Sequence, residues 1–151
     1  MVDLRQRAWD AAARVPDPEI PALTIADLGM LRDVTVGPEG VEVSITPTYS
    51  GCPAMTIIAL DITAALADAG IPGARVRTVL SPAWTADWLS EAARRKLAEC
   101  GIAPPCRGAA VACPRCASAE VERLSEFGST ACKSLWRCRA CREPFDVFKC
   151  H

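Results

Sequence analysis

The stretch "VEVSITPTYSGCPAMTIIALDITAALADAG", residues 41–70, decides the fold, because its apolar pattern changes from a strand period to a helix period across one short turn. Val41, Val43 and Ile45 alternate with polar residues, which predicts a strand with one buried face. The apolar run from about Pro53 to Ala69 predicts a helix that ends at Gly70. A strand that leads directly into a helix favours a fold that mixes both elements.

The flanking sequence extends this unit on both sides. "GPEG", residues 37–40, predicts a hairpin turn between two strands. Four more elements are expected: strands at 30–36 and 74–80, a helix from a cap at Asp3 to about Arg14, and a helix from about Ala86 to Glu99 capped by Thr85. The expected order is αββαβα, an α/β fold built as an α+β sandwich.

Composition gives no sign of a membrane or nucleic-acid protein. Half of the 151 residues are apolar, 23% are charged, and the formal net charge is −1. The first residues are charged from Asp3 onward, unlike a signal peptide, and the best apolar run, Pro53 to Leu60, is interrupted by Asp61. We therefore expect a cytoplasmic protein.

A change of composition near residue 106 predicts a domain boundary. Gly101, Pro104 and Pro105 end a helix and open a short linker. Residues 1–105 hold 9 basic and 13 acidic residues, a net charge of −4, whereas residues 106–151 hold 8 and 5, a net charge of +3. The sequence thus predicts an α/β domain over 1–105 and a small, mildly basic domain over 106–151.

Cysteines are concentrated in the second part, where eight of the nine lie at or after Cys100. Cys113 and Cys116 form one C-x2-C pair, and Cys138 and Cys141 form another after 21 intervening residues. Two such pairs can complete a tetrahedron around one ion, and a tail this short needs a metal to fold. The spacing predicts a zinc ribbon with structural zinc; iron, bound as in rubredoxin or as a cluster, is the less favoured alternative.

Other residues of the tail have no clear assignment from the sequence. Cys132 lies close enough to Cys138 to be an extra metal ligand. The sequence assigns no role to Cys100, Cys106, Cys150 or the terminal His151.

Cys52 stands apart from the other cysteines, between the predicted strand and helix. Gly51 allows a sharp turn, and Pro53 suits the first helical position, so Cys52 is expected at the helix N-terminus with a lowered pKa. The alternative is a small buried hydrophobic residue. His151 is the only histidine in the chain. A cysteine–histidine enzyme is therefore disfavoured.

Three acidic residues occur in loops of the first domain. Asp17 and Glu19 lie in a proline-framed segment, and Asp27 precedes a Leu-Gly pair. Taken alone, these residues are typical of turns and caps. Trp84 and Trp88 are expected to pack rather than to form a recognition surface.

Together these motifs resemble a known family. "DPEIP" (17–21), "DLGML" (27–31), "TYSGCPA" (48–54) and "SPAW" (81–84) resemble the iron–sulfur-assembly domain of SufT and of the cytosolic iron–sulfur targeting factor. The added ribbon, with "FGSTACKSLWRCRACREPFDVFKCH" (127–151), resembles PaaD, an accessory subunit of the phenylacetyl-CoA epoxidase of aerobic phenylacetate degradation. The resemblance covers nearly the whole chain.

The resemblance implies a non-catalytic role in iron–sulfur maturation of a partner, expected to be the reductase that supplies electrons to the epoxidase. By position, Cys52 is the thiol of the family motif, Thr48 is its nearby threonine, and Asp17, Glu19 and Asp27 match acidic positions of the family. These residues would contact iron or a transient iron–sulfur cluster, while the zinc ribbon would dock the client.

Two other functions are open alternatives. One is a structural subunit of the oxygenase complex that carries no cluster. The weaker one is a zinc-ribbon nucleic-acid binder, suggested by Trp136 among Arg137, Arg139 and Arg142 but disfavoured by the net charge. A homodimer is also open.

Overall fold

The computed structural model describes residues 3–49, 52–104 and 111–149, and it divides the chain into two compact units. The first unit spans residues up to Trp84 together with Trp88–Ser90. The second contains Thr85–Asp87 and the chain from Glu91 onward. This division places the third helix and the short strand after it with the ribbon, while the boundary expected near residue 106 stays a prediction.

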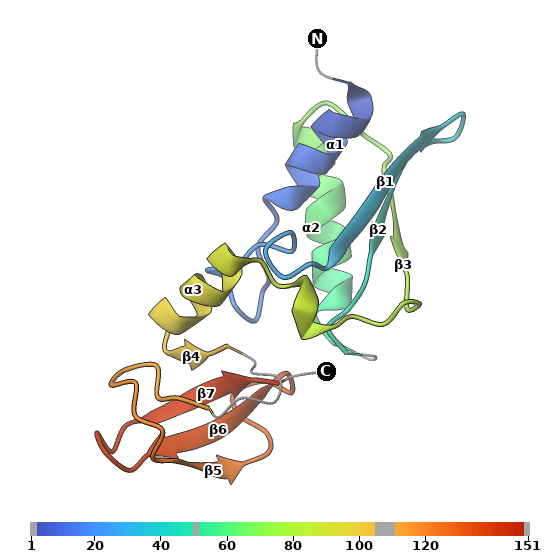
Figure 1. Cartoon of the computed structure of the whole chain (residues 1–151). Coiled ribbons are helices and arrows are strands. Elements are labelled where there is room, and N and C mark those ends of the chain that lie inside the picture. Colours follow the sequence, from blue (N-terminus) through green and yellow to red (C-terminus); the bar gives the residue numbers. More distant parts are fainter. Residues whose placement is uncertain (1–2, 50–51, 105–110, 150–151) are drawn as a thin grey trace. The chain divides into compact units, whose positions relative to one another are not determined.

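The first unit is a three-stranded sheet covered on one face by two helices (Figure 1). Its elements are α1 (Leu4–Ala13), β1 (Leu31–Gly37), β2 (Gly40–Ile45), α2 (Met55–Asp68) and β3 (Arg75–Thr78). β2 is central; it pairs antiparallel with β1 and parallel with β3. The mixed α+β fold expected from the sequence is confirmed, with α2 as the crossover between the two parallel strands.

The apolar periods of the sequence explain this packing. Val41, Val43 and Ile45 are buried on one face of β2, as the alternation predicts. Ile58, Ile62 and Leu66 recur every four residues along α2 and are fully buried. The Asp3 side chain accepts a hydrogen bond from the Arg5 N–H at 3.3 Å and caps α1 as expected.

Two helix starts differ from the expectation. α2 begins at Met55, with Ala54 at the N-cap and without a side-chain cap, rather than at Pro53. The helix expected from Ala86 is a 3-10 turn, Ala86–Trp88, followed by a break and by α3, Glu91–Glu99. The Ser90 N–H bonds to the Asp27 carbonyl at 3.4 Å, so it is diverted from a helical partner.

"DLGML" and "SPAW" pack together within the first unit. The Trp84 Nε1–H donates to the Leu28 carbonyl at 2.7 Å, and Trp84 is buried. Gly29 has φ +73°, and a Cβ added there would lie 2.6 Å from the Trp88 Cβ and 2.7 Å from its carbonyl oxygen. Both constraints require glycine at this position. The expected packing role of the two tryptophans is confirmed.

The second unit carries a four-stranded sheet in the order β4-β7-β6-β5. Its strands are β4 (Ile102–Ala103), β5 (Val121–Ser125), β6 (Lys133–Cys138) and β7 (Pro144–Phe148). A small buried cluster holds this sheet together: Ala103, Cys113, Cys138, Phe145 and Val147. Two of these five residues are cysteines of the C-x2-C pairs, so the core of the ribbon depends on its metal site.

No helix of the described residues is long and apolar enough to cross a membrane.

Candidate functional site

The four cysteines of the two C-x2-C pairs meet in the ribbon. Their sulfur atoms all lie within 4.8 Å of one another, with Cys113 Sγ 3.8 Å from Cys141 Sγ and Cys116 Sγ 3.5 Å from Cys138 Sγ. Four thiolates at about 2.3 Å from one zinc ion would be separated by roughly 3.8 Å. The donor set therefore fits tetrahedral zinc, and Cys113, Cys116, Cys138 and Cys141 would hold it.

Backbone geometry explains how each pair turns around the ion. Ala117 and Arg142, the residues directly after the second cysteine of each pair, have φ of +63° and +66°. Backbone N–H groups point at the sulfurs: Arg115 N is 3.4 Å from Cys113 Sγ, and Cys141 N is 3.5 Å from Cys138 Sγ. The chain thus adopts a left-handed turn at both positions although neither is glycine.

The pKa values of two sulfurs are shifted in opposite directions. The N–H of Cys141 stabilises the Cys138 thiolate and lowers the pKa of Cys138 to about 7. The N–H of Glu143 has the same effect on Cys141, but burial and the neighbouring sulfurs outweigh it and raise the pKa of Cys141 to about 11. A cation would replace the protons of this crowded group.

Cys132 lies outside the group of four. It is buried, and its Sγ is 3.0 Å from the Thr130 hydroxyl. Its role as an extra ligand stays a prediction. Cys100 is an exposed cysteine, and Cys106, Cys150 and His151 lie outside the described residues.

Arginines near Trp136 are partly neutralised within the ribbon. Arg137 and Arg139 both pair with Glu122, and these partners, Arg139 first, hold the pKa of Glu122 below its usual value. The Trp136 Nε1–H donates to the Ser134 hydroxyl at 2.9 Å, and the residue is half-buried. These contacts give no support to a nucleic-acid surface, which would need free cations beside exposed rings.

Cys52 lies in the first unit, two residues before the N-cap of α2, and only 9% of its surface is exposed. Burial raises the pKa of the Cys52 thiol; the N–H of Ala54 opposes this effect, and the Glu19 carboxylate adds to it. The expectation of a thiol at the helix N-terminus with a lowered pKa is therefore wrong. Helix α2 starts later than expected, and burial outweighs what its N-terminus contributes.

Acidic residues of the first loop act on this thiol. The charges of Glu19 and, less strongly, Asp17 raise the pKa of Cys52, whereas the side chain of Tyr49 lowers it. Asp17 is buried, and its Oδ1 accepts hydrogen bonds from the N–H groups of Glu19 at 2.7 Å and Ile20 at 3.0 Å. The structure thus brings Asp17 and Glu19 into electrostatic contact with Cys52.

Two other predicted site residues have distinct settings. Asp27 forms a reciprocal cap with Thr24: its Oδ2 accepts from the Thr24 N–H, and its own N–H donates to the Thr24 hydroxyl, both at 3.1 Å. Thr48 is buried, with 7% of its surface exposed. The capping role that the residues alone indicate for Asp27 is confirmed.

Sequence reasoning missed two polar residues of the segment that leads to the thiol. Tyr49 acts on Cys52, as described above. The Oγ1 atom of Thr46 is fully buried and has no hydrogen-bond partner among the described residues. Both residues lie within the "TPTYSGC" segment. A threonine at the buried end of a strand does not indicate, from the sequence alone, that its hydroxyl lacks a hydrogen-bond partner.

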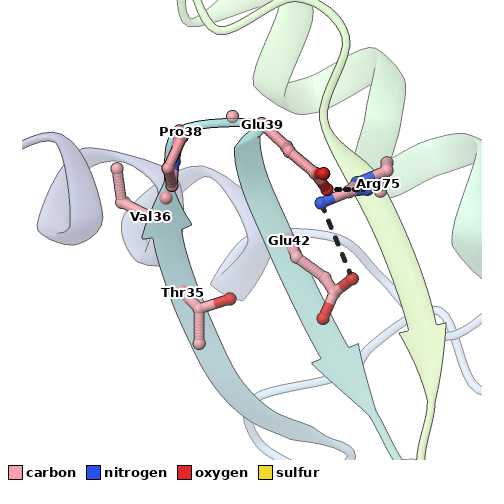
Figure 2. Close-up of a pocket in the computed structure, with 8 residues that line it drawn as sticks. Thr35, Val36, Pro38, Glu39, Glu42 and Arg75 are labelled. Carbon is pink, nitrogen blue, oxygen red and sulfur yellow. Dashed lines mark hydrogen bonds and ion pairs between the residues drawn. The ribbon is translucent and has the colours of Figure 1, made fainter.

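A hollow at the β1–β2 hairpin is a weaker candidate for a functional site than the surroundings of Cys52 (Figure 2). Its charged residues already pair: Arg75 lies 3.1 Å from Glu39 and 3.9 Å from Glu42. We therefore place the candidate site at Cys52 and not at this hairpin.

Comparisons with known proteins match both parts of the chain. Residues 5–81 match the model of an iron-sulfur cluster assembly protein, and residues 105–149 match the PaaD zinc beta ribbon domain. The chain is 50% identical over 149 residues to an Escherichia coli (strain K12) protein named as a component of 1,2-phenylacetyl-CoA epoxidase, covering 94% of this chain and 90% of that protein.

Other relatives match the first unit. The Fe-S protein maturation auxiliary factor YitW of Bacillus subtilis (strain 168) is 33% identical over 93 residues, 60% of this chain and 90% of its own. A Bacillus anthracis domain of unknown function, DUF59, superposes with a TM-score of 0.57 at 26% identity, covering 62% of this chain and 90% of that one. The conserved hypothetical protein TM0487 from Thermotoga maritima superposes with a TM-score of 0.52 at 26% identity, covering 63% of this chain and 94% of that one. The chain belongs to the PaaD family, in which an iron–sulfur-assembly domain is followed by a zinc beta ribbon.

Proposed function

We propose that this chain is a non-catalytic maturation subunit of a phenylacetyl-CoA epoxidase system, and that it assists iron–sulfur cluster assembly in a partner in the cytoplasm. The observation that carries the proposal is the Cys52 thiol, held beside Asp17 and Glu19 in an iron–sulfur-assembly domain that shares its chain with a four-cysteine ribbon. The 50% identity to the Escherichia coli epoxidase component supports the choice of system.

In this proposal, iron or a cluster in transit is the cargo of the first unit. The Cys52 sulfur would bind the iron after the thiol loses its proton. The carboxylates of Asp17 and Glu19 would bind the iron through oxygen or would orient the groups that bind it. Thr48 and Asp27 would support the same region. The buried Thr46 hydroxyl is a further polar group that a cargo could satisfy. The zinc ribbon would dock the client, for which we propose the iron–sulfur reductase of the complex.

One observation favours the alternative of a structural subunit that handles no cluster. Cys52 is buried and its pKa is raised, which are also the properties of a packed cysteine without chemistry. The two functions differ in what happens to the client. A maturation subunit changes the client's metal content, whereas a structural subunit changes only its activity within the complex.

The test is to co-express the reductase with the natural chain, with Cys52→Ser, and with Cys100→Ser as a matched control at an exposed cysteine. We expect purified reductase to lose most of its iron and acid-labile sulfide with Cys52→Ser and none with Cys100→Ser. Full cluster content with Cys52→Ser, together with lost epoxidase activity, would instead support the structural subunit.

A further inference from the structure

A shallow apolar groove runs along the first unit between α2 and β3. It is lined by Met55, Thr56, Ala59, Leu60, Thr63, Val76 and Thr78. Leu60 is 64% exposed, and Leu80, just beyond β3, is 60% exposed. The Met55 N–H donates to the Cys52 carbonyl at 3.3 Å, so the groove begins next to the backbone of Cys52.

Strand β3 forms the outer edge of the sheet beside this groove (Figure 1). β2 pairs with one side of β3, and no other described strand pairs with its second side. The Val79 N–H donates to the Ile45 carbonyl of β2 at 2.8 Å. Because backbone groups alternate along a strand, Val76 and Thr78 direct their N–H and C=O groups to the open side. An extended segment could bond to these groups.

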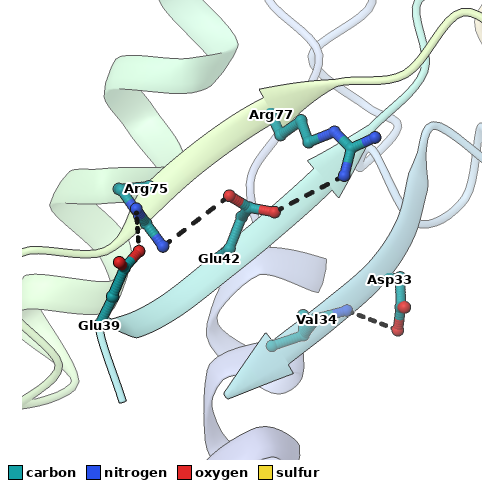
Figure 3. Close-up of polar contacts among 6 residues, drawn as sticks. All are labelled: Asp33, Val34, Glu39, Glu42, Arg75 and Arg77. Carbon is teal, nitrogen blue, oxygen red and sulfur yellow. Dashed lines mark hydrogen bonds and ion pairs between the residues drawn. The ribbon is translucent and has the colours of Figure 1, made fainter. Parts of the chain in front are cut away.

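The side chains of β3 differ between its two faces. Val76 lies opposite the buried Val43, on the helix-covered face, whereas Arg75 and Arg77 lie on the other face. Figure 3 shows Glu42 between the two arginines, at 3.9 Å from Arg75 and 4.0 Å from Arg77. The side chain of Arg77 is 66% exposed and makes no closer ion pair among the described residues. A partner strand with acidic side chains on this face would complement it.

A second copy of the chain fits this edge poorly. If two β3 strands paired antiparallel about Val76, Arg75 of one copy would lie directly opposite Arg77 of the other. Pairing about Arg77 would place that residue opposite itself. Like charges directly opposite one another destabilise a sheet, and charged residues at an edge discourage self-pairing.

We propose that the edge of β3 and the adjoining groove bind an extended segment of the client, in which acidic residues alternate with apolar ones. The segment adds a strand to β3; its apolar side chains lie against Leu60 and Val76, and its acidic side chains face Arg75 and Arg77. This inference rests on the proposed function, because it describes how the client reaches the Cys52 loop.

The probe is a fluorescein-labelled peptide of three Glu-Val repeats, blocked at both ends, and the readout is fluorescence anisotropy with the full zinc-loaded chain. We expect saturable binding that weakens with salt and is stronger than that of a matched Lys-Val peptide. Thr78→Pro removes an edge N–H and should weaken binding about fivefold. Leu60→Ser should weaken it about tenfold, and Arg77→Glu should reverse the preference between the two peptides.

Matched controls lie on β1, at the opposite edge of the sheet, and on α1 beside it. Val36→Ser replaces an apolar residue of β1 that is 46% exposed, and Arg5→Glu removes an exposed arginine paired with Asp33 at 3.0 Å. Both variants should bind like the natural chain. No binding of the Glu-Val peptide at millimolar concentration, or equal weakening by the control variants, would overturn the proposal.

Reductase maturation separates this inference from the proposed function. If Leu60→Ser and Thr78→Pro leave the reductase fully loaded while Cys52→Ser does not, the edge is not the docking site and the proposed function stands. If the peptide results hold while Cys52→Ser has no effect on cluster content, the docking surface stands and the proposed function fails.

Discussion

The two units of this chain reach a folded state by different means. The first unit buries a continuous set of large aliphatic side chains between a sheet and two helices, including Leu23, Ile25, Ile58, Ile62 and Leu66. The ribbon buries a cluster of five residues, two of which are metal-ligating cysteines. The core of the first unit is therefore built from aliphatic side chains alone at its centre, whereas two of the cysteines of the ribbon are part of the core itself.

The largest expected effect is at the ribbon. Cys138 is fully buried and lies in both the sulfur group and the apolar cluster. We expect Cys138→Ser to abolish zinc binding and to unfold the ribbon completely, because metal binding supplies the free energy of folding in such small domains. Limited proteolysis with mass spectrometry would show cleavage confined to the second unit. Cys100→Ser is the control, and a protease-resistant ribbon in Cys138→Ser would contradict the prediction.

In the first unit, a comparable loss requires a change in the apolar core. Ile62 is fully buried in α2, and Ile62→Ala should lower the free energy of unfolding by about 3 kcal/mol. Ile57 lies on the same helix and is 50% exposed, so Ile57→Ala should change it by less than about 0.5 kcal/mol. Denaturant melts of the zinc-loaded chain measure both values. Equal effects of the two variants would show that the core does not depend on α2 as described.

The reactivity of Cys52 should follow its burial. Since burial raises the pKa of its thiol, alkylation by iodoacetamide should increase only at pH values above those at which the same cysteine reacts in the unfolded chain. Peptide mass spectrometry isolates Cys52 from the other cysteines, and zinc protects those of the ribbon. Faster alkylation in the folded chain than in the unfolded chain at neutral pH would show that the thiol is activated and would contradict a pKa raised by burial.

The smallest expected effect is at the left-handed residues after each cysteine pair. Arg142 is exposed with φ +66°, a conformation that costs a side-chain-bearing residue about 1–2 kcal/mol. Arg142→Gly should remove this strain but raise the conformational entropy of the unfolded chain, which opposes folding. The net stabilisation should be less than about 1 kcal/mol. Ala140→Gly, nearby and without a positive φ, should destabilise. The two variants can be compared by the chelator concentration at which half of the zinc is released. An unchanged or lower concentration for Arg142→Gly would contradict the presence of strain at Arg142.

Local patterns made much of this structure predictable. The order of strands and helices in the first unit follows from periods of two and of 3.6 residues, and the ribbon ligands follow from spacing alone. The setting of Cys52 could not be predicted in the same way. Gly51 and Pro53 suggested a helix start, but α2 begins at Met55, and residues far along the chain contribute to what surrounds the thiol. Burial of this kind depends on tertiary packing, which leaves no local signal.

The break between the 3-10 turn and α3 shows the same limit. Thr85 does cap a helical turn, since its hydroxyl accepts the Asp87 N–H at 3.3 Å, as local sequence indicates. The interruption that follows depends on the Ser90 N–H, which bonds to a carbonyl of residue 27. A contact across more than sixty residues is outside the range of pattern reasoning.

The uneven exposure of the four sulfurs bears on how the ribbon exchanges its metal. Cys113 and Cys138 are buried, whereas Cys116 is exposed. A chelator or a competing thiol would approach from the Cys116 corner and displace one ligand before the others. Exchange would then proceed stepwise, with the incoming ligand taking the place of Cys116 before the other three sulfurs are released. The lifetime of the ion in the ribbon would then depend on how readily the Cys116 sulfur is replaced.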